Sequence, residues 1–441
     1  MKKYLFFSLV ALLFVACTPN EDDNPSRPQH NSKCIHYTAT AKIEMEWTFD
    51  TFGANIVSHE WDNVTSEGVI TFDGDVTTIG DYAFNSCSNL TSVTIPDSVT
   101  TIGEDAFAGC YSLTEFNGKF ASEDGRCLIV DGVLTYFAPA NLTSYTIPDS
   151  VTTIGDNAFL RCSNLTSISI PDSVTTIVYG AFAYCDSLTS VTIPDSVTTI
   201  GYGAFCGCDS LTEFNSKFAS EDGRCLIVDG TLNSFAPAGL TSYTIPDSVT
   251  TIGDYAFYYC LNLTNINLPD SVTTIGNEAF ENCIKLSDIT IPNSVTTIGY
   301  GAFCNCQSLP NITLPDNVTI IDIATFFGCS SLTDVIIGNR VTTIEQRAFA
   351  SCSNLTSIVI PNSVTTIING AFYECLSLAS VYCEATTPPS LDGSYVFYSN
   401  ASDRLIYVPA ASVEAYKTAE YWSEYTDAIV GYDFENGVVV E

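Results

Sequence analysis

Histidine and basic side chains are the scarcest functional groups in this 441-residue chain. The three histidines, His30, His36 and His59, lie near the N-terminus, so residues 60–441 contain none. Most catalytic triads and many zinc sites use histidine, and the sequence therefore argues against such sites over most of its length. Lysine and arginine total 15 against 50 acidic residues, which gives a formal charge of −35. Nucleic acids and anionic lipid headgroups would repel this chain and are not expected as partners.

Long apolar runs are also missing, apart from one segment at the N-terminus. Two lysines precede an apolar run from Tyr4 to Ala16. This run is too short to span a bilayer as a helix but suits the core of a signal peptide. Its last residues, Leu-Phe-Val-Ala-Cys at positions 13–17, resemble the lipobox of bacterial lipoproteins, which implies cleavage after residue 16 and lipidation of Cys17. A plain secretory signal followed by an incidental cysteine is the alternative.

The segment after Cys17 is polar and acidic. Residues 18–24 read Thr-Pro-Asn-Glu-Asp-Asp-Asn and contain no apolar side chain that could pack, so a flexible tether is expected. An acidic stretch directly after the lipidated cysteine also resembles the surface-export signal of Bacteroides-type lipoproteins. We therefore expect a signal peptide at 1–16 and a tether at 17–33. The exported chain is then held to the outer membrane at the cell surface by its lipid anchor only.

Internal repetition dominates the rest of the chain. The string Ile-Pro-Asp-Ser-Val-Thr-Thr-Ile-Gly recurs at intervals of 23 residues, except for two intervals of 52. Each long interval divides into a regular unit of 23 residues and a long unit of 29, with hidden anchor positions at Gly118 and Ser216. Fourteen anchors then run from Phe72 to Cys383, and residues 95–193 nearly repeat as 193–291. A repeat array is the only economical interpretation of this periodicity.

Each regular unit contains two extended pieces and one turn. Leu90-Thr-Ser-Val-Thr-Ile95 has the apolar spacing of a leucine-rich-repeat strand, and the following proline begins a turn. Val99 to Ile102 forms a second short strand, and Ala106-Phe107 with Cys110 fits one buried helical turn. Because one unit cannot bury its apolar side alone, we predict a repeat solenoid of about fourteen coils at residues 72–382. It should be a right-handed superhelix with a parallel β-sheet on its concave face and the single helical turns on its outer side.

The two long units contain a hairpin signal. In each, two apolar runs are joined by Asp-Gly, at residues 127–137 and again at 225–235. We expect each hairpin to replace the Ala-Phe-x-x-Cys turn on the outer side. A tolerated insertion and a contact site are both consistent with this pattern.

Cysteine follows the repeat rather than a disulfide framework. Cys206 and Cys304 each start a Cys-x-Cys pair whose second member is a repeat residue, so no metal site is expected. Eleven of the 18 cysteines lie three residues after phenylalanine, where stacked coils would bury them as small apolar side chains with parallel directions that do not suit disulfides. These ladder cysteines are Cys87, Cys110, Cys162, Cys185, Cys208, Cys260, Cys283, Cys306, Cys329, Cys352 and Cys375.

Two sets of repeat positions are candidate functional residues. Tyrosine at variable positions amid Ser, Gly and Asn is typical of adaptable recognition surfaces, although half-buried packing explains each tyrosine individually. The Asp-Ser-Val turns also resemble the Bacteroides O-glycosylation motif, although a solvated turn explains them as well. The candidate binding tyrosines are Tyr82, Tyr179, Tyr202, Tyr255 and Tyr300. The candidate glycosylated serines are Ser98, Ser150, Ser173, Ser196, Ser248 and Ser271.

The unit Leu-Thr-Ser-Val-Thr-Ile-Pro-Asp-Ser-Val-Thr-Thr-Ile-Gly-x-x-Ala-Phe-x-x-Cys closely resembles the BspA-like leucine-rich repeat family of bacterial surface proteins. Residues 383–441 look like the C-terminal cap of that family, and residues 34–71 fit an N-terminal cap, which a solenoid needs to cover its terminal apolar faces. The resemblance implies surface display and adhesive binding of an extracellular protein or glycan, without catalysis or cofactors.

Two functions remain in competition. The first is a binding surface for an extracellular macromolecule. The second is a structural spacer or surface-layer component without a specific ligand, which the nearly invariant repeat favours because specific sites usually break repetition. No phosphate loop, nucleophile elbow or acid pair stands out from the repeat, so an enzyme is not expected.

Overall fold

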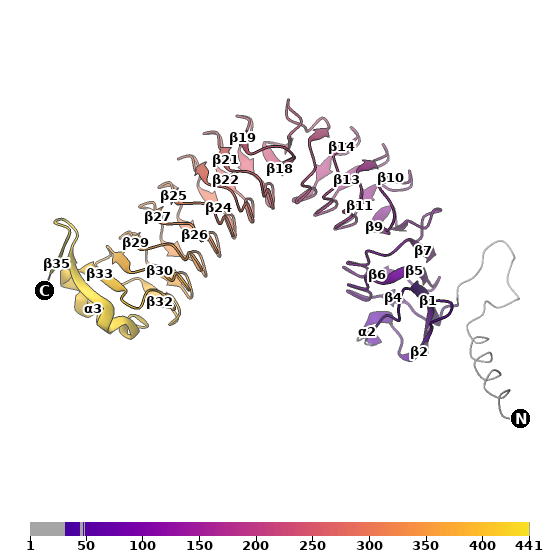
Figure 1. Cartoon of the computed structure of the whole chain (residues 1–441), viewed down its shortest axis with the longest axis horizontal. Helices are drawn as coiled ribbons and strands as arrows, with labels where there is room; N and C mark the ends of the chain where they lie inside the picture. The colour runs from indigo at the N-terminus through magenta and orange to yellow at the C-terminus, as the bar shows by residue number, and fades with distance from the viewer. Residues whose placement is uncertain (1–30, 45–46, 48, 441) are drawn as a thin grey trace, which may run out of the picture. The chain divides into compact units, whose positions relative to one another are not determined.

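The computed structural model describes residues 31–44, 47 and 49–440, and these divide into two compact units. The first runs to Ala181 and includes Ser196–Thr199, and the second comprises Phe182–Asp195 and the chain from Ile200 onward. Both are built of stacked coils (Figure 1), and the chain is a parallel β-solenoid of about 15 turns with few helices. The predicted solenoid of about fourteen coils is therefore confirmed. The predicted signal peptide, most of the tether and Cys17 lie outside the described residues.

The first unit begins with an antiparallel sheet. Strand β3 (Glu67–Phe72) pairs antiparallel with both β1 (Cys34–Ala39) and β2 (Ile56–Asp62), and the short helix α2 (Phe49–Phe52) precedes β2. Strand β1 also pairs antiparallel with β5 (Leu90–Ile95), the first long rung of the repeat. The edge of the first coil is thereby covered by β1, in the region predicted as the N-terminal cap.

Two parallel ladders follow in the first unit. Registers such as Ser92 opposite Glu115 and Thr153 opposite Thr176 show that each rung pairs with the same position of the next repeat unit. The Leu-Thr-Ser-Val-Thr-Ile rungs of this unit fall into two sheets, with β5 paired to β7 (Glu115–Gly118) in one and β10 (Ser144–Thr146) paired to β12 (Ser167–Ser169) in the other. The Thr-Thr-Ile ladder contains β4 (Thr78–Ile79), β6 (Thr101–Ile102), β11 (Thr153–Ile154) and β13 (Thr176–Ile177), and β15 (Thr199–Ile200) spans the boundary between the units.

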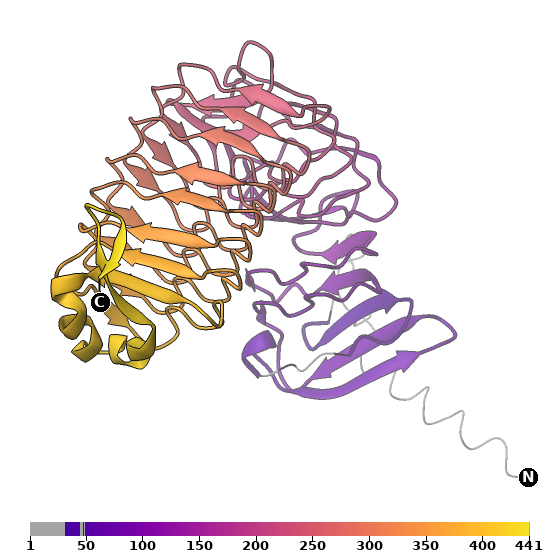
Figure 2. The same cartoon turned by 60° about the vertical axis from the view of Figure 1, so that its left-hand side comes forward.

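The second unit repeats the same two ladders. Its longer rungs are stacked side by side in Figure 2. They are β14 (Ser190–Thr192), β16 (Glu213–Asn215), β19 (Ser242–Thr244), β21 (Asn265–Asn267), β23 (Asp288–Thr290), β25 (Asn311–Thr313), β27 (Asp334–Ile336), β29 (Ser357–Ile360) and β31 (Ser380–Cys383). The second ladder comprises β20 (Thr251–Ile252), β22 (Thr274–Ile275), β24 (Thr297–Ile298), β26 (Ile320–Ile321), β28 (Thr343–Ile344), β30 (Thr366–Ile368) and β32 (Ser390–Asp392).

The C-terminal end of the second unit departs from the repeat. Strands β33 (Leu405–Pro409) and β34 (Ile429–Asp433) continue the parallel sheet, and β35 (Val438–Val440) pairs antiparallel with β34. Between them lie the 3₁₀ helix η2 (Ala410–Ser412), the helix α3 (Val413–Thr418) and the 3₁₀ helix η3 (Trp422–Ala428). Trp422 and Tyr416 are completely buried, and each donates a hydrogen bond to a backbone carbonyl of the segment 385–389.

The outer turns are not helical, and that prediction is wrong. In a representative turn, the amides of Glu278, Phe280 and Asn282 donate to carbonyls of the next coil at 2.9, 2.8 and 2.9 Å. The intervening amides of Glu281 and Cys283 donate three residues back, at 3.1 Å each. An α-helix would satisfy its amides internally, whereas here alternate amides bond to the next coil and keep the outer turns at the strand spacing of about 5 Å. The outer side is therefore a third ladder between coils.

The core of each unit is a column of phenylalanine rings. In the second unit, Phe257, Phe280 and Phe303 stack with centroid distances of 5.0 and 5.3 Å and interplanar angles of 12° and 6°. In the first unit, Phe84 and Phe107 stack at 5.2 Å and 6°. The rings therefore repeat at about the spacing of the β-strands. Each ring packs against the ring of the coil before it and the ring of the coil after it.

The ladder cysteines are buried thiols, as predicted, and none forms a disulfide. Their role is more specific than apolar filling, because seven of the thiols donate to the carbonyl of the phenylalanine 26 residues earlier at 3.0–3.2 Å. Burial raises the pKa of Cys87 to about 11 and the pKa of Cys306 well above its usual range, which keeps the thiol protonated as a donor. Each of these seven cysteines thus adds a side-chain bond between neighbouring coils.

The hidden anchors and hairpins of the long units are also confirmed. Gly118 pairs with Ile95, the anchor of the preceding unit, as a regular rung would. Strands β8 (Cys127–Val130) and β9 (Val133–Phe137), and their copies β17 (Cys225–Val228) and β18 (Thr231–Phe235), form antiparallel hairpins. At the first turn, Asp131 and Gly132 have φ of 49° and 81°, the conformation that makes Asp-Gly a hairpin turn.

The predicted position of the hairpins requires correction. Strand β9 pairs parallel with β11, with Val133 opposite Thr153, so the hairpin occupies the position of the Thr-Thr-Ile strand rather than that of the outer turn. The outer turn is instead shortened. After Leu134, which pairs with Ile154, residues 135–142 (the end of β9 and the loop after it) lead to the next rung. The following regular coil takes residues 155–165 for the same path. We call 135–142 and its copy, 233–240, the shortened crossings.

Replacing Phe280 by alanine should destabilise the second unit by about 3–5 kcal/mol, because a completely buried ring leaves a cavity between two stacked neighbours. The free energy of unfolding from urea titration measures this loss. The matched control is Tyr202→Ala, which removes an aromatic ring that is 50% exposed. Equal losses for the two variants would show that the phenylalanine column does not stabilise the coils.

Candidate functional site

The shortened crossings interrupt the outer ladder. In regular coils the outer turn donates to the next coil, as Phe257 does to Ala279 at 2.8 Å. The turns at 105–109 and 203–207 precede the long units, and within the described residues their amides make no such bonds to a following coil. At the two long units, therefore, the outer turn of the preceding coil is not covered by another outer turn. Side chains from other coils can pack against it there.

A group of tyrosines occupies this position in the second unit. The ring of Tyr184 lies 6.2 Å from Tyr258 and 5.6 Å from Tyr259, edge-on to both, and the last two rings are 4.8 Å apart. Tyr255 adds a ring 5.5 Å from Tyr258, and its hydroxyl lies 3.3 Å from that of Tyr300. We call these five residues the tyrosine cluster. Edge-to-face rings at these distances stabilise one another.

Two glycines make room for the cluster. A Cβ atom on Gly207 would lie 2.8 Å from the ring of Tyr184, and one on Gly203 would lie 3.3 Å from the Cβ of Tyr255. Both glycines also have positive φ, at 68° and 61°, which side chains rarely adopt. The turn before the second long unit therefore presents bare backbone, over which the tyrosines of the neighbouring coils pack.

Two acidic residues adjoin the cluster. Burial raises the pKa of Glu281 to about 7, and a hydrogen bond and charge repulsion from Glu278 add to that effect. The side-chain amide of Asn282 donates to the Glu281 carboxyl group at 3.1 Å. Burial also raises the pKa of the neighbouring thiols, Cys206 and Cys304, to about 12 each. The surface beside the tyrosines thus gains negative charge as the pH rises through neutrality.

The structure separates the five tyrosines predicted from the sequence. Tyr255 and Tyr300 belong to the tyrosine cluster. Tyr82, Tyr179 and Tyr202 are 54%, 45% and 50% exposed, and the structure does not place them with it. Sequence reasoning missed Tyr184, Tyr258 and Tyr259. A comparison of positions 98 residues apart could have found them, because the residues equivalent to these three are Ser86, Leu160 and Arg161.

The candidate glycosylation serines divide into two kinds. Ser98, Ser196 and Ser271 are partly buried, and their hydroxyls donate to a valine carbonyl of the preceding coil at 2.7–2.8 Å. The hydroxyl of Ser173 is buried and has no partner among the described residues. Ser150 and Ser248, which follow the hairpins, are exposed. Only these two present an accessible side chain, and their modification stays a prediction.

Neither metal nor membrane chemistry is evident in the part of the chain that the structure covers. Within the described residues no group of three or more His, Cys, Asp or Glu side chains could hold a metal ion. The helices described there are all too short or too polar to cross a membrane.

Replacing Glu281 by glutamine should flatten the pH dependence of stability. The folded state raises the pKa of Glu281 from 4.5 to about 7, so it binds the proton more tightly than the unfolded chain. This contribution to stability is complete below about pH 4.5 and is lost as the pH rises to about 7. Urea titrations at several pH values should therefore show a gain for Glu281→Gln over the wild type that grows across this range. Asp247→Asn, at an exposed turn, is the control, and a gain independent of pH would contradict the shifted pKa.

Comparisons with known proteins agree with this architecture. The profile of the BspA-type leucine-rich repeat region matches in six copies over residues 42–122, 134–221, 231–329 and 273–404. A leucine-rich repeat protein from Bacteroides ovatus is 30% identical, with 81% of this chain and 88% of that chain covered and a TM-score of 0.43. No curated protein matches.

Two further solved structures are similar. A leucine-rich cell surface protein from Faecalibacterium prausnitzii is 27% identical, with 80% of this chain and 85% of its own covered and a TM-score of 0.41. A leucine-rich repeat protein from Eubacterium ventriosum is 26% identical, with coverage of 74% and 81% and a TM-score of 0.50. The repeat profile covers most of the described residues, and the chain belongs to the BspA-type leucine-rich repeat family.

Proposed function

We propose that this chain is a non-catalytic binding protein of the bacterial cell surface, and that it holds an extracellular protein or glycan through the tyrosine cluster. The observation that carries the proposal is the cluster itself. Five tyrosines from three coils meet beside the second long unit, and of the residues 98 positions earlier, beside the first long unit, only Tyr202 is a tyrosine.

The chemistry of the cluster suits recognition. Tyrosine supplies a large contact area at a low cost in side-chain entropy, and its hydroxyl can donate or accept a hydrogen bond. Tyr184, Tyr255, Tyr258 and Tyr259 are half-buried and Tyr300 is 40% exposed, so the rings are fixed by their neighbours while their edges face solvent. Rigid aromatic residues of this kind dominate the binding energy of many interfaces.

A structural spacer is the competing function. The near-identity of the regular coils supports it, since a spacer needs only uniform stacking. It gives no reason, however, for Tyr184 and Tyr255 to pack over Gly207 and Gly203. The residues 98 positions before these two tyrosines are Ser86 and Asn157. Binding gives a reason for the tyrosines that depart from the repeat.

A position at the cell surface supports the same function. The similar protein from Faecalibacterium prausnitzii is named a leucine-rich cell surface protein. The N-terminal residues of this chain, with a signal-like run ending at Cys17, fit export and lipidation. One lipidated cysteine with several acyl chains would anchor the chain firmly, because each buried methylene adds about 0.8 kcal/mol.

Replacing three cluster tyrosines by the residues found 98 positions earlier should abolish binding. The variant combines Tyr184→Ser, Tyr255→Asn and Tyr258→Leu, which the equivalent coils of the first copy already accommodate. The purified mature chain and this variant are screened against immobilised matrix proteins, mucins and glycans. We expect the wild type to retain a ligand that the variant loses by at least tenfold, about 1.4 kcal/mol or more.

The control for that screen is Tyr111→Ser, which removes a tyrosine that is 46% exposed and lies outside the cluster. It should bind as the wild type does. Retention of every ligand by the cluster variant, or failure of the wild type to bind anything on the array, would favour the spacer function.

The location is tested separately in intact cells. Cys17→Ala should release the chain from the membrane fraction, because it removes the only proposed lipid attachment. The control for this variant is Cys206→Ala, which removes a cysteine elsewhere in the chain and should stay in the membrane fraction. Protease added to intact cells that carry the wild-type chain should degrade the array. An array untouched by protease would contradict surface display.

A further inference from the structure

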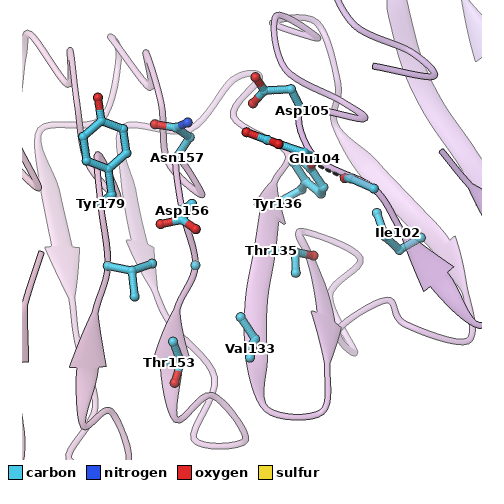
Figure 3. Close-up of a pocket in the computed structure, with 13 residues that line it drawn as sticks. Ile102, Glu104, Asp105, Val133, Thr135, Tyr136, Thr153, Asp156, Asn157 and Tyr179 are labelled. Atoms are coloured by element: carbon cyan, nitrogen blue, oxygen red, sulfur yellow. Dashed lines mark hydrogen bonds between the residues drawn. The ribbon is translucent and has the colours of Figure 1, made fainter. Parts of the chain in front are cut away.

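A pocket adjoins the first shortened crossing. It lies within the first unit, has a volume of about 620 Å³ and is lined by thirteen residues (Figure 3). Figure 3 shows Tyr179, Asn157 and Asp156 on one side of it, and Tyr136 and Glu104 on the other. These side chains come from the coil before the hairpin, the hairpin coil itself and the coils that follow it. The pocket is therefore a product of the long unit.

The floor of the pocket is fixed by hydrogen bonds. The hydroxyl of Tyr136 donates to the carbonyl of Gly103 at 2.8 Å and accepts from the amide of Ala106 at 2.8 Å. In regular coils the equivalent alanine amide donates to the equivalent glycine carbonyl of the same turn, as Ala83 does to Gly80 at 3.2 Å, so the Tyr136 hydroxyl is inserted between these two groups. A pocket closed by a rigid aromatic floor is preformed, which lowers the entropic cost of binding.

The lining is acidic and aromatic. Glu104, Asp105 and Asp156 contribute three carboxyl groups, and none of the thirteen lining residues is lysine, arginine or histidine. The ring of Tyr179 is 45% exposed at the rim. Burial raises the pKa of Tyr136, and the negative charges of Asp105 and Glu104 raise it further. The Tyr136 hydroxyl is therefore close enough to these two carboxylates to interact with their charge. The net charge of −35 adds a long-range attraction for cations.

The second copy lacks this lining. At the positions of Glu104, Asp105 and Asn157 it carries Tyr202, Gly203 and Tyr255, and at the position of Tyr136 it carries Ser234. There, Tyr255 packs over Gly203. The two long units therefore provide different surfaces on the same framework, a tyrosine cluster in the second and an acidic pocket in the first.

We propose that this pocket binds the guanidinium group of an arginine on a partner protein. Carboxylates accept paired hydrogen bonds from the planar guanidinium fork, and Tyr179 offers a ring face against which the group can stack. A divalent metal is not favoured, because the described residues contain no cluster of three metal-ligating side chains. A neutral sugar would not use the negative charge of the lining, whereas a cation is attracted by it. The site is distinct from the tyrosine cluster, and its failure would leave the proposed function intact.

The test is a titration of the full mature chain with the peptide acetyl-Gly-Arg-Gly-amide, followed by saturation-transfer NMR and calorimetry at low ionic strength. The same peptide with citrulline in place of arginine is the neutral control. We expect saturable binding of the arginine peptide only. The pocket variant, Glu104→Gln with Asp105→Asn and Asp156→Asn, should weaken that binding at least about tenfold, because it removes charged acceptors without changing shape.

A charge-matched variant makes the result specific. Asp97→Asn with Asp149→Asn and Asp172→Asn removes three carboxylates from exposed turns of the same unit. It should bind the arginine peptide as tightly as the wild type does. An equal loss in both variants would mean that binding follows net charge alone, and equal binding of the citrulline peptide would mean that the guanidinium charge is not recognised. Either result, or no binding at all, overturns the proposal.

Discussion

The constraint on which the structure depends is the spacing of about 5 Å between neighbouring coils. Two β-ladders impose it through backbone hydrogen bonds. The outer turns must then match it, and they do so by donating alternate amides to the next coil instead of forming helices. The phenylalanine rings, 5.0–5.5 Å apart in most regular steps, and the thiol bonds to the phenylalanine carbonyls follow the same spacing. A residue that fits one coil therefore fits every coil, which accounts for the near-identity of the units.

The same constraint explains where the repeat departs from uniformity. A hairpin takes the place of one Thr-Thr-Ile strand in each long unit, and the crossing that follows is too short to form the outer turn. The outer turn of the preceding coil therefore has no following outer turn to bond to. Side chains pack against it instead. In the first unit Tyr136 fills part of the space and leaves an acidic pocket. In the second unit Tyr184 and Tyr258 meet across it.

Much of the fold could be predicted from the sequence because its signals are periodic. The pairing of equivalent positions in successive units, the hidden anchor at Gly118 and the Asp-Gly hairpins all follow from apolar spacing and turn chemistry. The outer turn could not be predicted, because Ala-Phe-x-x-Cys has helical spacing in one coil, and only the bonds to the next coil decide against a helix. The thiol bonds to the carbonyls were missed for the same reason, since they join different coils.

The candidate sites were predicted less completely. Tyr255 and Tyr300 stood out as variable positions, but Tyr184 is distant from Tyr258 along the chain and meets it only in the folded coils. The acidic pocket likewise combines Glu104 from one coil with Tyr179 from another, and no local motif connects them. What the sequence did contain was the contrast between the two nearly identical copies, 95–193 and 193–291, at positions such as Tyr136 against Ser234 and Asn157 against Tyr255.

Amide hydrogen exchange tests the central claim most directly, namely that backbone bonds join the outer turns of regular coils and are interrupted before the long units. The account predicts that the amides of Glu278, Phe280 and Asn282 exchange as slowly as that of Gly276, which donates to the neighbouring coil at 2.8 Å. The amides of residues 203–207 should exchange much faster. Equal protection of both turns, or rapid exchange at 278–282, would contradict it.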